Sequence, residues 1–156
     1  MASHLEKVKN NKELLGPNVI DNVERGLKYS MKDITWAHQE QTKIYNNFRK
    51  FFENYDVLIC PAASVSPFPH EQLFVEEINN EKLPTYMRWL ALSYAPTMAI
   101  PCAWALPCGL DHKNLPFGIQ LIAPAGDDAK LSEIALAIED ALSNYEETKR
   151  AIPDIV

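Results

Sequence analysis

Two short apolar runs joined by a polar turn restrict the fold of this chain more than any other feature. They lie within Ala103–Gly126, which reads AWALPCGLDHKNLPFGIQLIAPAG. The runs Trp104–Leu106 and Phe117–Ile122 have the length and composition of strands. Each run has a proline at its inner end, where a missing N–H is best tolerated. The pattern predicts two strands joined by a loop of several residues.

The second of these runs is apolar on both alternating faces, apart from Gln120. Such a run is typical of a strand that is covered on both sides of its sheet. An amide left unpaired in that setting costs about 1–3 kcal/mol. Gln120 is therefore expected to find hydrogen-bond partners inside the protein.

Composition and charge set the class of protein and exclude some partners. The chain has 156 residues, of which 47% are hydrophobic, so one globular domain with a substantial core is expected. A formal net charge of -6 argues against direct binding to nucleic acid or to an anionic membrane. The N-terminal residues MASHLEKVKNN lack the apolar core of a secretory signal. Three prolines interrupt the longest apolar stretch, near Trp89–Leu110, so no membrane span is expected. The sequence predicts a soluble, cytoplasmic protein.

Helical periodicity predicts several further elements. They cover Leu5–Leu15 (ended by Gly16 and Pro17), Asn18–Tyr29, Ser30 to about Tyr55, Pro84 to about Tyr94, and a last helix that begins near Gly126 with Asp127 or Asp128 as its cap. Ser30 has the hydroxyl of an N-cap, and Asp33 adds a favourable charge in the first turn. The helix from Ser30 carries an aromatic-rich stripe at steps of three and four. That stripe is expected to pack on a flat apolar surface.

A continuous apolar run, Val57–Cys60, follows the long helix directly. It is expected to be a central strand, and the order of helix then strand predicts an α/β fold with mixed sheet strands packed by helices. The next residues, through Pro69, contain three prolines and must form a loop. A loop at the end of a central strand is a common place for ligand contacts. The acidic stretch Glu71–Lys82 is expected to be a mobile connection.

Motifs that would carry chemistry are hard to find in this chain. Cys60, Cys102 and Cys108 are an odd number of cysteines in apolar surroundings, which indicates free thiols in a reducing compartment. Their spacing to His112 does not match a zinc site, and the five glycines form no phosphate-binding loop. No metal and no cofactor are expected. The residues alone indicate an α/β domain without a recognisable active site.

The ordered set of motifs nevertheless resembles the C-terminal part of the amidase signature enzymes. The resemblance rests on YDVLICPAA at Tyr55–Ala63, on LPCGLDHKNLPFGIQLIAPAGDDAKL at Leu106–Leu131, and on the pattern F-R-x-F-F at Phe48–Phe52. It extends from about Val19 to Tyr145. It implies that residues 1–156 are a single domain forming the C-terminal part of an amidase-like α/β/α fold without its N-terminal catalytic half.

Members of this family cleave or transfer amides with two serines and a lysine that lie in a Gly/Ser-rich segment of the N-terminal half. No such segment occurs in this sequence. The serines of the chain stand outside that context: Ser3, Ser30, Ser64, Ser66, Ser93, Ser132 and Ser143. A serine without an adjacent base is a weak nucleophile. We therefore assign no catalytic residue.

The resemblance also implies that the C-terminal part lines a substrate pocket for a small-molecule amide. The candidate pocket residues are Ala62, Ala63, Ser64, Tyr94 and Thr97. Strands separated from the rest of a sheet would expose pairing edges. The expected partners are therefore a second copy of the chain or the missing N-terminal half.

Three functional classes stay open at this point. The chain can be a fragment of an amide hydrolase that is inactive alone, or part of the related amidotransferase that amidates misacylated tRNA. It can also be a non-catalytic binding or scaffold domain. A Gly/Ser-rich signature encoded immediately upstream would favour the first, and co-purifying partner chains would favour the second.

Overall fold

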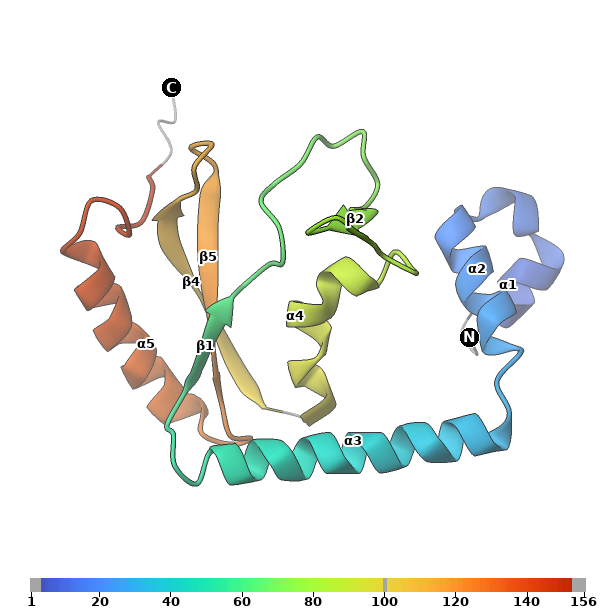
Figure 1. Ribbon diagram of the computed structural model, residues 1–156, viewed down its shortest axis with the longest axis horizontal. Coiled ribbons are helices and arrows are strands. Elements are labelled where there is room, and N and C mark those ends of the chain that lie inside the picture. Colours follow the sequence, from blue (N-terminus) through green and yellow to red (C-terminus); the bar gives the residue numbers. More distant parts are fainter. Residues whose placement is uncertain (1–3, 100, 153–156) are drawn as a thin grey trace. The chain divides into compact units, whose positions relative to one another are not determined.

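The computed structural model describes residues 4–99 and 101–152, and it divides into two compact units. The first unit covers residues 1–42 and the second covers residues 43–156, so the boundary falls inside the long helix α3, Met31–Phe51. Each unit is described by itself below. The second unit contains all the strands of the described chain (Figure 1).

The first unit begins with short helices around one buried side chain, Val23. Its elements are α1 (Leu5–Asn10), the 3-10 turn η1 (Lys12–Leu14) and α2 (Pro17–Gly26). The prediction of one helix over Leu5–Leu15 was wrong, since α1 ends at Asn10. Pro17 begins α2 instead of only ending a helix, because the first helical position needs no N–H. Lys12 Nζ lies 2.7 Å from Glu24 Oε1 and ties the η1 turn to α2.

The start of α3 agrees with the sequence prediction. The Asp33 carboxylate accepts hydrogen bonds from the Ser30 backbone N–H at 2.8 Å and from its hydroxyl at 2.7 Å. The Asp33 N–H in turn donates to Ser30 Oγ at 3.3 Å. This reciprocal arrangement is the capping box of a helix N-terminus.

The stripe along α3 is not packed as expected. None of the helix residues is buried, and Ile34 and Tyr45 remain 44% and 41% exposed. At the C-terminal end the aromatic rings contact one another, and Phe51 stacks on Tyr55 at 4.6 Å between ring centroids. The prediction that the whole stripe packs on a flat apolar surface was therefore wrong for the described residues. Periodicity indicates the apolar face of a helix but not the partner of that face.

A three-stranded antiparallel sheet forms the centre of the second unit, in the order β1-β5-β4 (Figure 1). Its strands are β1 (Leu58–Pro61), β4 (Cys102–Leu110) and β5 (Pro116–Ala123). The hairpin predicted from the two apolar runs is confirmed, with Ala105 opposite Gln120 and Trp104 opposite Leu121. The central position expected for β1 was wrong: β5 pairs on both sides, while β1 lies at an edge of this sheet and Ile59 is 49% exposed.

The turn of the β4–β5 hairpin is shorter than predicted because β4 continues to Leu110. The register shifts between Pro107 and Leu110, where Gly109 takes a positive φ of 68°. This combination is a β-bulge, in which glycine tolerates the left-handed backbone at least cost. The Asp111 carboxylate closes the turn by accepting from the N–H groups of Lys113 at 2.8 Å and Leu115 at 3.0 Å.

Helix α5 (Asp128–Ser143) packs on β4 and β5 and supplies one side of the core. In Figure 1 it runs alongside the sheet. The buried cluster consists of Leu106, Leu121, Ala123, Leu131 and Ala135. Leu131 and Ala135 confirm the apolar stripe predicted for this helix. Asp127 occupies the N-cap position but makes no side-chain capping bond, and Tyr145 lies beyond the helix end.

The segment between β1 and β4 holds more structure than the sequence indicated. A small hairpin, β2 (Glu77–Ile78) with β3 (Glu81–Lys82), occupies the stretch that was expected to be a mobile connection. Asn79 and Asn80 both have positive φ, as a type I′ turn requires, and asparagine tolerates that conformation. The helix predicted from Pro84 is reduced to η2 (Arg88–Leu90), α4 (Ala91–Tyr94) and η3 (Pro96–Ala99). Pro84 and Pro96 limit its length.

Candidate functional site

A pocket of about 350 Å³ lies where the chain leaves β1. Its lining residues come from the loop after β1, from η2 and from the start of β5: Ala62, Ala63, Val65, Ser66, Pro67, Phe68, Trp89, Pro116, Phe117 and Gly118. Of the five candidate pocket residues, Ala62 and Ala63 line it. We call this hollow the loop pocket.

Backbone and side-chain hydrogen bonds hold the base of the loop pocket. The Ala62 N–H donates to the Gly118 carbonyl at 2.9 Å and prolongs the pairing of β1 with β5. The Ala62 carbonyl accepts from the Ser93 hydroxyl at 3.3 Å. These two bonds join the loop to the sheet and to α4, which brings together segments about thirty residues apart in sequence.

Gln120 has the interior partners that its position demanded. Its side-chain amide donates to the Pro61 carbonyl at 3.1 Å and to the Leu92 carbonyl at 2.9 Å. The amide thus bridges the end of β1 and the short helix α4. Gln120 is a structural hydrogen-bonding group that lies outside the lining of the loop pocket.

The walls of the loop pocket are aromatic and apolar. Phe68 and Trp89 meet edge to face, with ring centroids 5.5 Å apart and an angle of 78° between the planes. Ser66 is the single residue with a hydroxyl group in the described lining. A pocket of this composition suits an uncharged, apolar group.

An acid from the hairpin turn lies beside the Ser66 side chain. The backbone N–H of Leu115 holds the pKa of Asp111 below its usual range, and the Ser66 hydroxyl and the Lys113 N–H act in the same direction. A carboxylate that accepts several hydrogen bonds stays ionised to lower pH. The Oδ1 atom of Asp111 makes the two bonds within the hairpin turn, whereas its buried Oδ2 has no hydrogen-bond partner among the described residues.

The other three candidate residues do not line the loop pocket. Ser64 is in the same loop but does not contribute to the lining. The Thr97 hydroxyl donates to the Tyr94 carbonyl at 2.6 Å, a bond within the turn between α4 and η3. Near Tyr94 in the chain, the Ser93 hydroxyl donates to the carbonyl of Ala62, and the Trp89 ring lines the loop pocket. Trp89, in η2, and Phe117, in β5, were not among the candidates because both are distant from the loop in sequence.

The hydroxyls that could act as nucleophiles make bonds of a structural kind. Ser132 donates to the Ala129 carbonyl and Ser143 to the Asp140 carbonyl, both within or at the end of α5. Ser93 donates to Ala62, and Ser30 caps α3. Ser3 lies outside the described residues. These contacts give Ser30, Ser93, Ser132 and Ser143, four of the six described serines, a role in local structure.

The cysteines are free thiols, as predicted. Burial raises the pKa of Cys60, and it also raises the pKa of Cys102, with a further contribution from the nearby Asp128 charge. The Cys102 thiol donates to the Pro124 carbonyl at 3.1 Å. A raised pKa leaves little thiolate at neutral pH, and thiolate is the nucleophilic form.

Metal ligands and membrane-spanning helices are both absent from the part of the chain that the structure describes. Residues 4–99 and 101–152 contain no group of three or more His, Cys, Asp and Glu side chains able to hold a metal ion. Over the same residues, no helix has both the length and the apolar character needed to cross a membrane.

Comparison with known proteins identifies the family to which this fold and pocket belong. The family model described as Amidase matches residues 5–131, so the chain belongs to the amidase family. The A subunit of Glutamyl-tRNA(Gln) amidotransferase from Streptomyces avermitilis is 34% identical over 106 residues and covers 67% of this chain. The protein of the same name from Bacillus cereus is 31% identical over 115 residues and covers 74% of this chain.

Solved structures show the same fold. A structure described as a vestigial protein complex that reveals the origins of an s-triazine catabolic enzyme matches 97% of this chain with a TM-score of 0.81 at 18% identity. A bacterial aryl acylamidase of the amidase signature family matches 89% of the chain with a TM-score of 0.72 at 20% identity. At these identities the likeness concerns the fold alone. It confirms the partial α/β amidase fold.

The match covers only part of each relative. The chain spans about a fifth of the length of the curated relatives, 20% for the Streptomyces avermitilis protein and 22% for the Bacillus cereus protein. It covers 32% and 29% of the two solved chains.

Proposed function

We propose that this chain supplies the C-terminal part of the fold and one wall of the substrate pocket in an amide (carbon–nitrogen bond) hydrolase, as a single domain. The observation that carries the proposal is the amidase match over residues 5–131 together with the loop pocket at the end of β1. The substrate in the intact enzyme is a small-molecule amide. The wall includes Ala62 and Ala63, with Ser64, Tyr94 and Thr97 as more distant candidates.

The catalytic groups are proposed to come from the N-terminal half of the enzyme. The family resemblance implies that two serines and a lysine in a Gly/Ser-rich segment carry out catalysis. The 156-residue sequence contains no such segment. The bonds made by Ser93, Ser132 and Ser143 are compatible with purely structural roles. The chain by itself is therefore proposed to be inactive, and it requires no cofactor or metal.

The proposed partner is the missing half or a second copy of this chain. The edges of β1 and β4 support this, because within the described three-stranded sheet each pairs on one side only, with β5. Unpaired strand edges readily accept another strand. Sedimentation at increasing concentration is expected to show association. A monomer that persists at high concentration, whatever the salt, would contradict the proposal.

A second candidate function is a place in a tRNA-dependent amidotransferase. It is favoured by the names of the curated relatives, which are the A subunits of Glutamyl-tRNA(Gln) amidotransferases. Such a protein is expected to co-purify with partner subunits other than the missing amidase half, whereas a hydrolase fragment is expected to associate only with that half or with itself. No direct contact with nucleic acid is proposed for this chain, given its net charge of -6.

The proposed function is tested by reconstitution. The reading frame upstream of this sequence is expected to encode a Gly/Ser-rich segment preceded by a lysine some tens of residues earlier. That polypeptide, mixed or co-expressed with the chain, is expected to restore amide hydrolysis. Stable assembly without hydrolysis, or no assembly at all, would favour the third class, a non-catalytic binding domain.

A further inference from the structure

A second pocket, of about 320 Å³, lies between the end of α3 and the two ends of the β4–β5 hairpin. Its lining residues come from α3, from the turn directly after it, and from the chain segments next to β4 and β5: Tyr45, Phe48, Arg49, Phe52, Glu53, Ala99, Pro101, Pro124 and Ala125. We call it the helix pocket. It belongs entirely to the second unit and shares no lining residue with the loop pocket.

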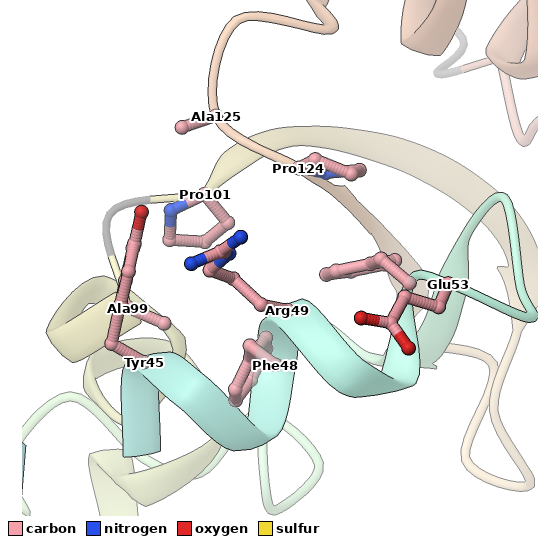
Figure 2. A pocket seen from close by; sticks show the side chains of 9 residues that line it. Tyr45, Phe48, Arg49, Glu53, Ala99, Pro101, Pro124 and Ala125 are labelled. Atoms are coloured by element: carbon pink, nitrogen blue, oxygen red, sulfur yellow. The ribbon is translucent and has the colours of Figure 1, made fainter. Parts of the chain in front are cut away.

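The body of the helix pocket is apolar and partly aromatic. Tyr45 and Phe48 come from α3 and Phe52 from the turn directly after it, and prolines stand on the opposite side. Figure 2 shows the Arg49 guanidinium extending from the helix toward Pro101, with Tyr45 beside it. The helix pocket can therefore hold an apolar group among its rings and a charged group beside Arg49 at its border.

Arg49 and Glu53 are the two charged residues in the described lining, and they have opposite sign. Neither takes part in the ion pairs formed by the described residues. Arg49 lies in α3, whereas Glu53 lies in the turn after it, so the two are not an i,i+4 pair of one helix. In Figure 2 their charged ends stand at separate places around the hollow. Both charges are thus available to a ligand.

We propose that the helix pocket binds a free amino acid with an apolar side chain. The carboxylate of the ligand pairs with the Arg49 guanidinium, whose planar fork matches it, and the ligand ammonium pairs with the Glu53 carboxylate. The side chain of the ligand lies among the aromatic and proline rings. A pair of opposite, unneutralised charges on an apolar pocket fits a zwitterion better than it fits an anion or a cation alone. The inference does not depend on the proposed hydrolase function.

The ligand class is tested on the full chain by titration followed in ¹H–¹⁵N NMR spectra. The probes are L-phenylalanine, N-acetyl-L-phenylalanine, which has no ammonium group, and L-phenylalaninamide, which has no carboxylate. L-Phenylalanine is expected to shift the amide signals of Tyr45, Arg49, Glu53 and Ala125 in a saturable manner. Each one-charge analogue is expected to bind about tenfold more weakly, because it loses one charge-assisted contact.

Variants identify which residue binds which charge. Arg49→Gln is expected to weaken L-phenylalanine binding about tenfold and to leave L-phenylalaninamide unaffected, since that probe has no carboxylate to lose. Glu53→Gln is expected to do the same for L-phenylalanine and to leave N-acetyl-L-phenylalanine unaffected. The matched control is Lys50→Gln, on the same exposed helix but outside the lining. It is expected to change nothing.

Three results would overturn the proposal. Equal binding of the three probes would make the pocket a purely apolar one. Weakening of all probes alike by Arg49→Gln would mean that the residue shapes the pocket without binding the carboxylate. The absence of any saturable shift at concentrations of about 50 mM would show that the pocket binds no amino acid of this class. Because no arm measures hydrolysis, these outcomes leave the proposed function untouched.

Discussion

Helices α3 and α5 carry the same kind of apolar stripe and yet differ completely in what covers it. On α5 the stripe faces β4 and β5, and Leu131 and Ala135 are buried to 1% exposure. On α3 no described residue is buried, and Ile34 in its stripe remains 44% exposed. The difference teaches that a periodic stripe predicts a helix and its apolar face, while the presence of a partner is a separate matter. Because the apolar side of α3 is not buried, the binding of a partner there would change the exposure of many apolar side chains.

The largest loss of unfolding free energy is expected for a substitution in the buried stripe of α5. Leu131→Ala removes a fully buried side chain from the core cluster and is expected to lower the free energy of unfolding by about 2–5 kcal/mol. Ile34→Ala, in the exposed stripe of α3, is expected to change it by no more than about 0.5 kcal/mol. Urea unfolding of the two variants measures the contrast. A similar loss for both would mean that α3 is covered in solution, as it would be in a self-associated chain.

The next largest loss of stability is expected at Gly109, whose backbone lies next to the segment that follows α5. A Cβ at Gly109 would clash with the backbone carbonyl of Glu147, and the residue has a φ of 68°. Gly109→Ala is expected to cost about 2–4 kcal/mol by thermal or urea unfolding. The control is Gly126→Ala, where φ is 90° but nothing lies within 4 Å, so only about 1–2 kcal/mol is expected. Equal costs would show that the clash is relieved by movement of the C-terminal segment.

The amide bridge of Gln120 is expected to have an intermediate effect. Gln120→Met keeps much of the volume but leaves the carbonyls of Pro61 and Leu92 without this donor. A loss of about 1–3 kcal/mol in unfolding free energy is expected. Hydrogen exchange of the Leu92 region should accelerate as α4 separates from the sheet. An unchanged stability would mean that water replaces the amide.

The smallest effect concerns acid stability and compares the two regions directly. Asp111 in the sheet hairpin and Asp33 at the start of α3 both have lowered pKa values, the first through the Leu115 N–H and the second through the Ser30 hydroxyl. A lowered pKa in the folded state stabilises the protein above the usual carboxyl pKa and loses that effect as pH falls through the folded value. Asp111→Asn should therefore flatten the decline in sheet stability below about pH 4. Asp33→Asn should reduce only the helical signal of α3, by far-ultraviolet circular dichroism.

Local chemistry in the sequence was sufficient for the elements that depend on near neighbours. The Ser30–Asp33 cap, the β4–β5 hairpin and the α5 stripe all arise from residues a few positions apart, and all were predicted. The small hairpin at Glu77–Lys82 was missed although its Asn79–Asn80 pair is a turn signal. Its two-residue strands are too short to show alternation.

What depended on distant contacts could not be obtained from the sequence. The edge position of β1 follows from β5 pairing on both sides, which no local pattern encodes. The loop pocket combines Ala62 with Trp89 from η2 and Phe117 from β5, and both are distant from Ala62 in sequence. Ala62 and Ala63 could be named as candidates because the loop follows a strand. The proximity of Ser66 to Asp111 could not be anticipated, because Asp111 lies far away in sequence, in the hairpin turn.

An amide-hydrolysis assay on the purified chain is the most direct test that it carries a fold and a pocket wall without the catalytic groups. Release of aniline from acetanilide and of ammonia from benzamide would be followed, with the Ser64→Ala and Cys108→Ala variants in parallel. The expected result is no product above the buffer control for any of the three proteins. Turnover that follows the chain through purification and disappears in either variant would contradict the proposed function.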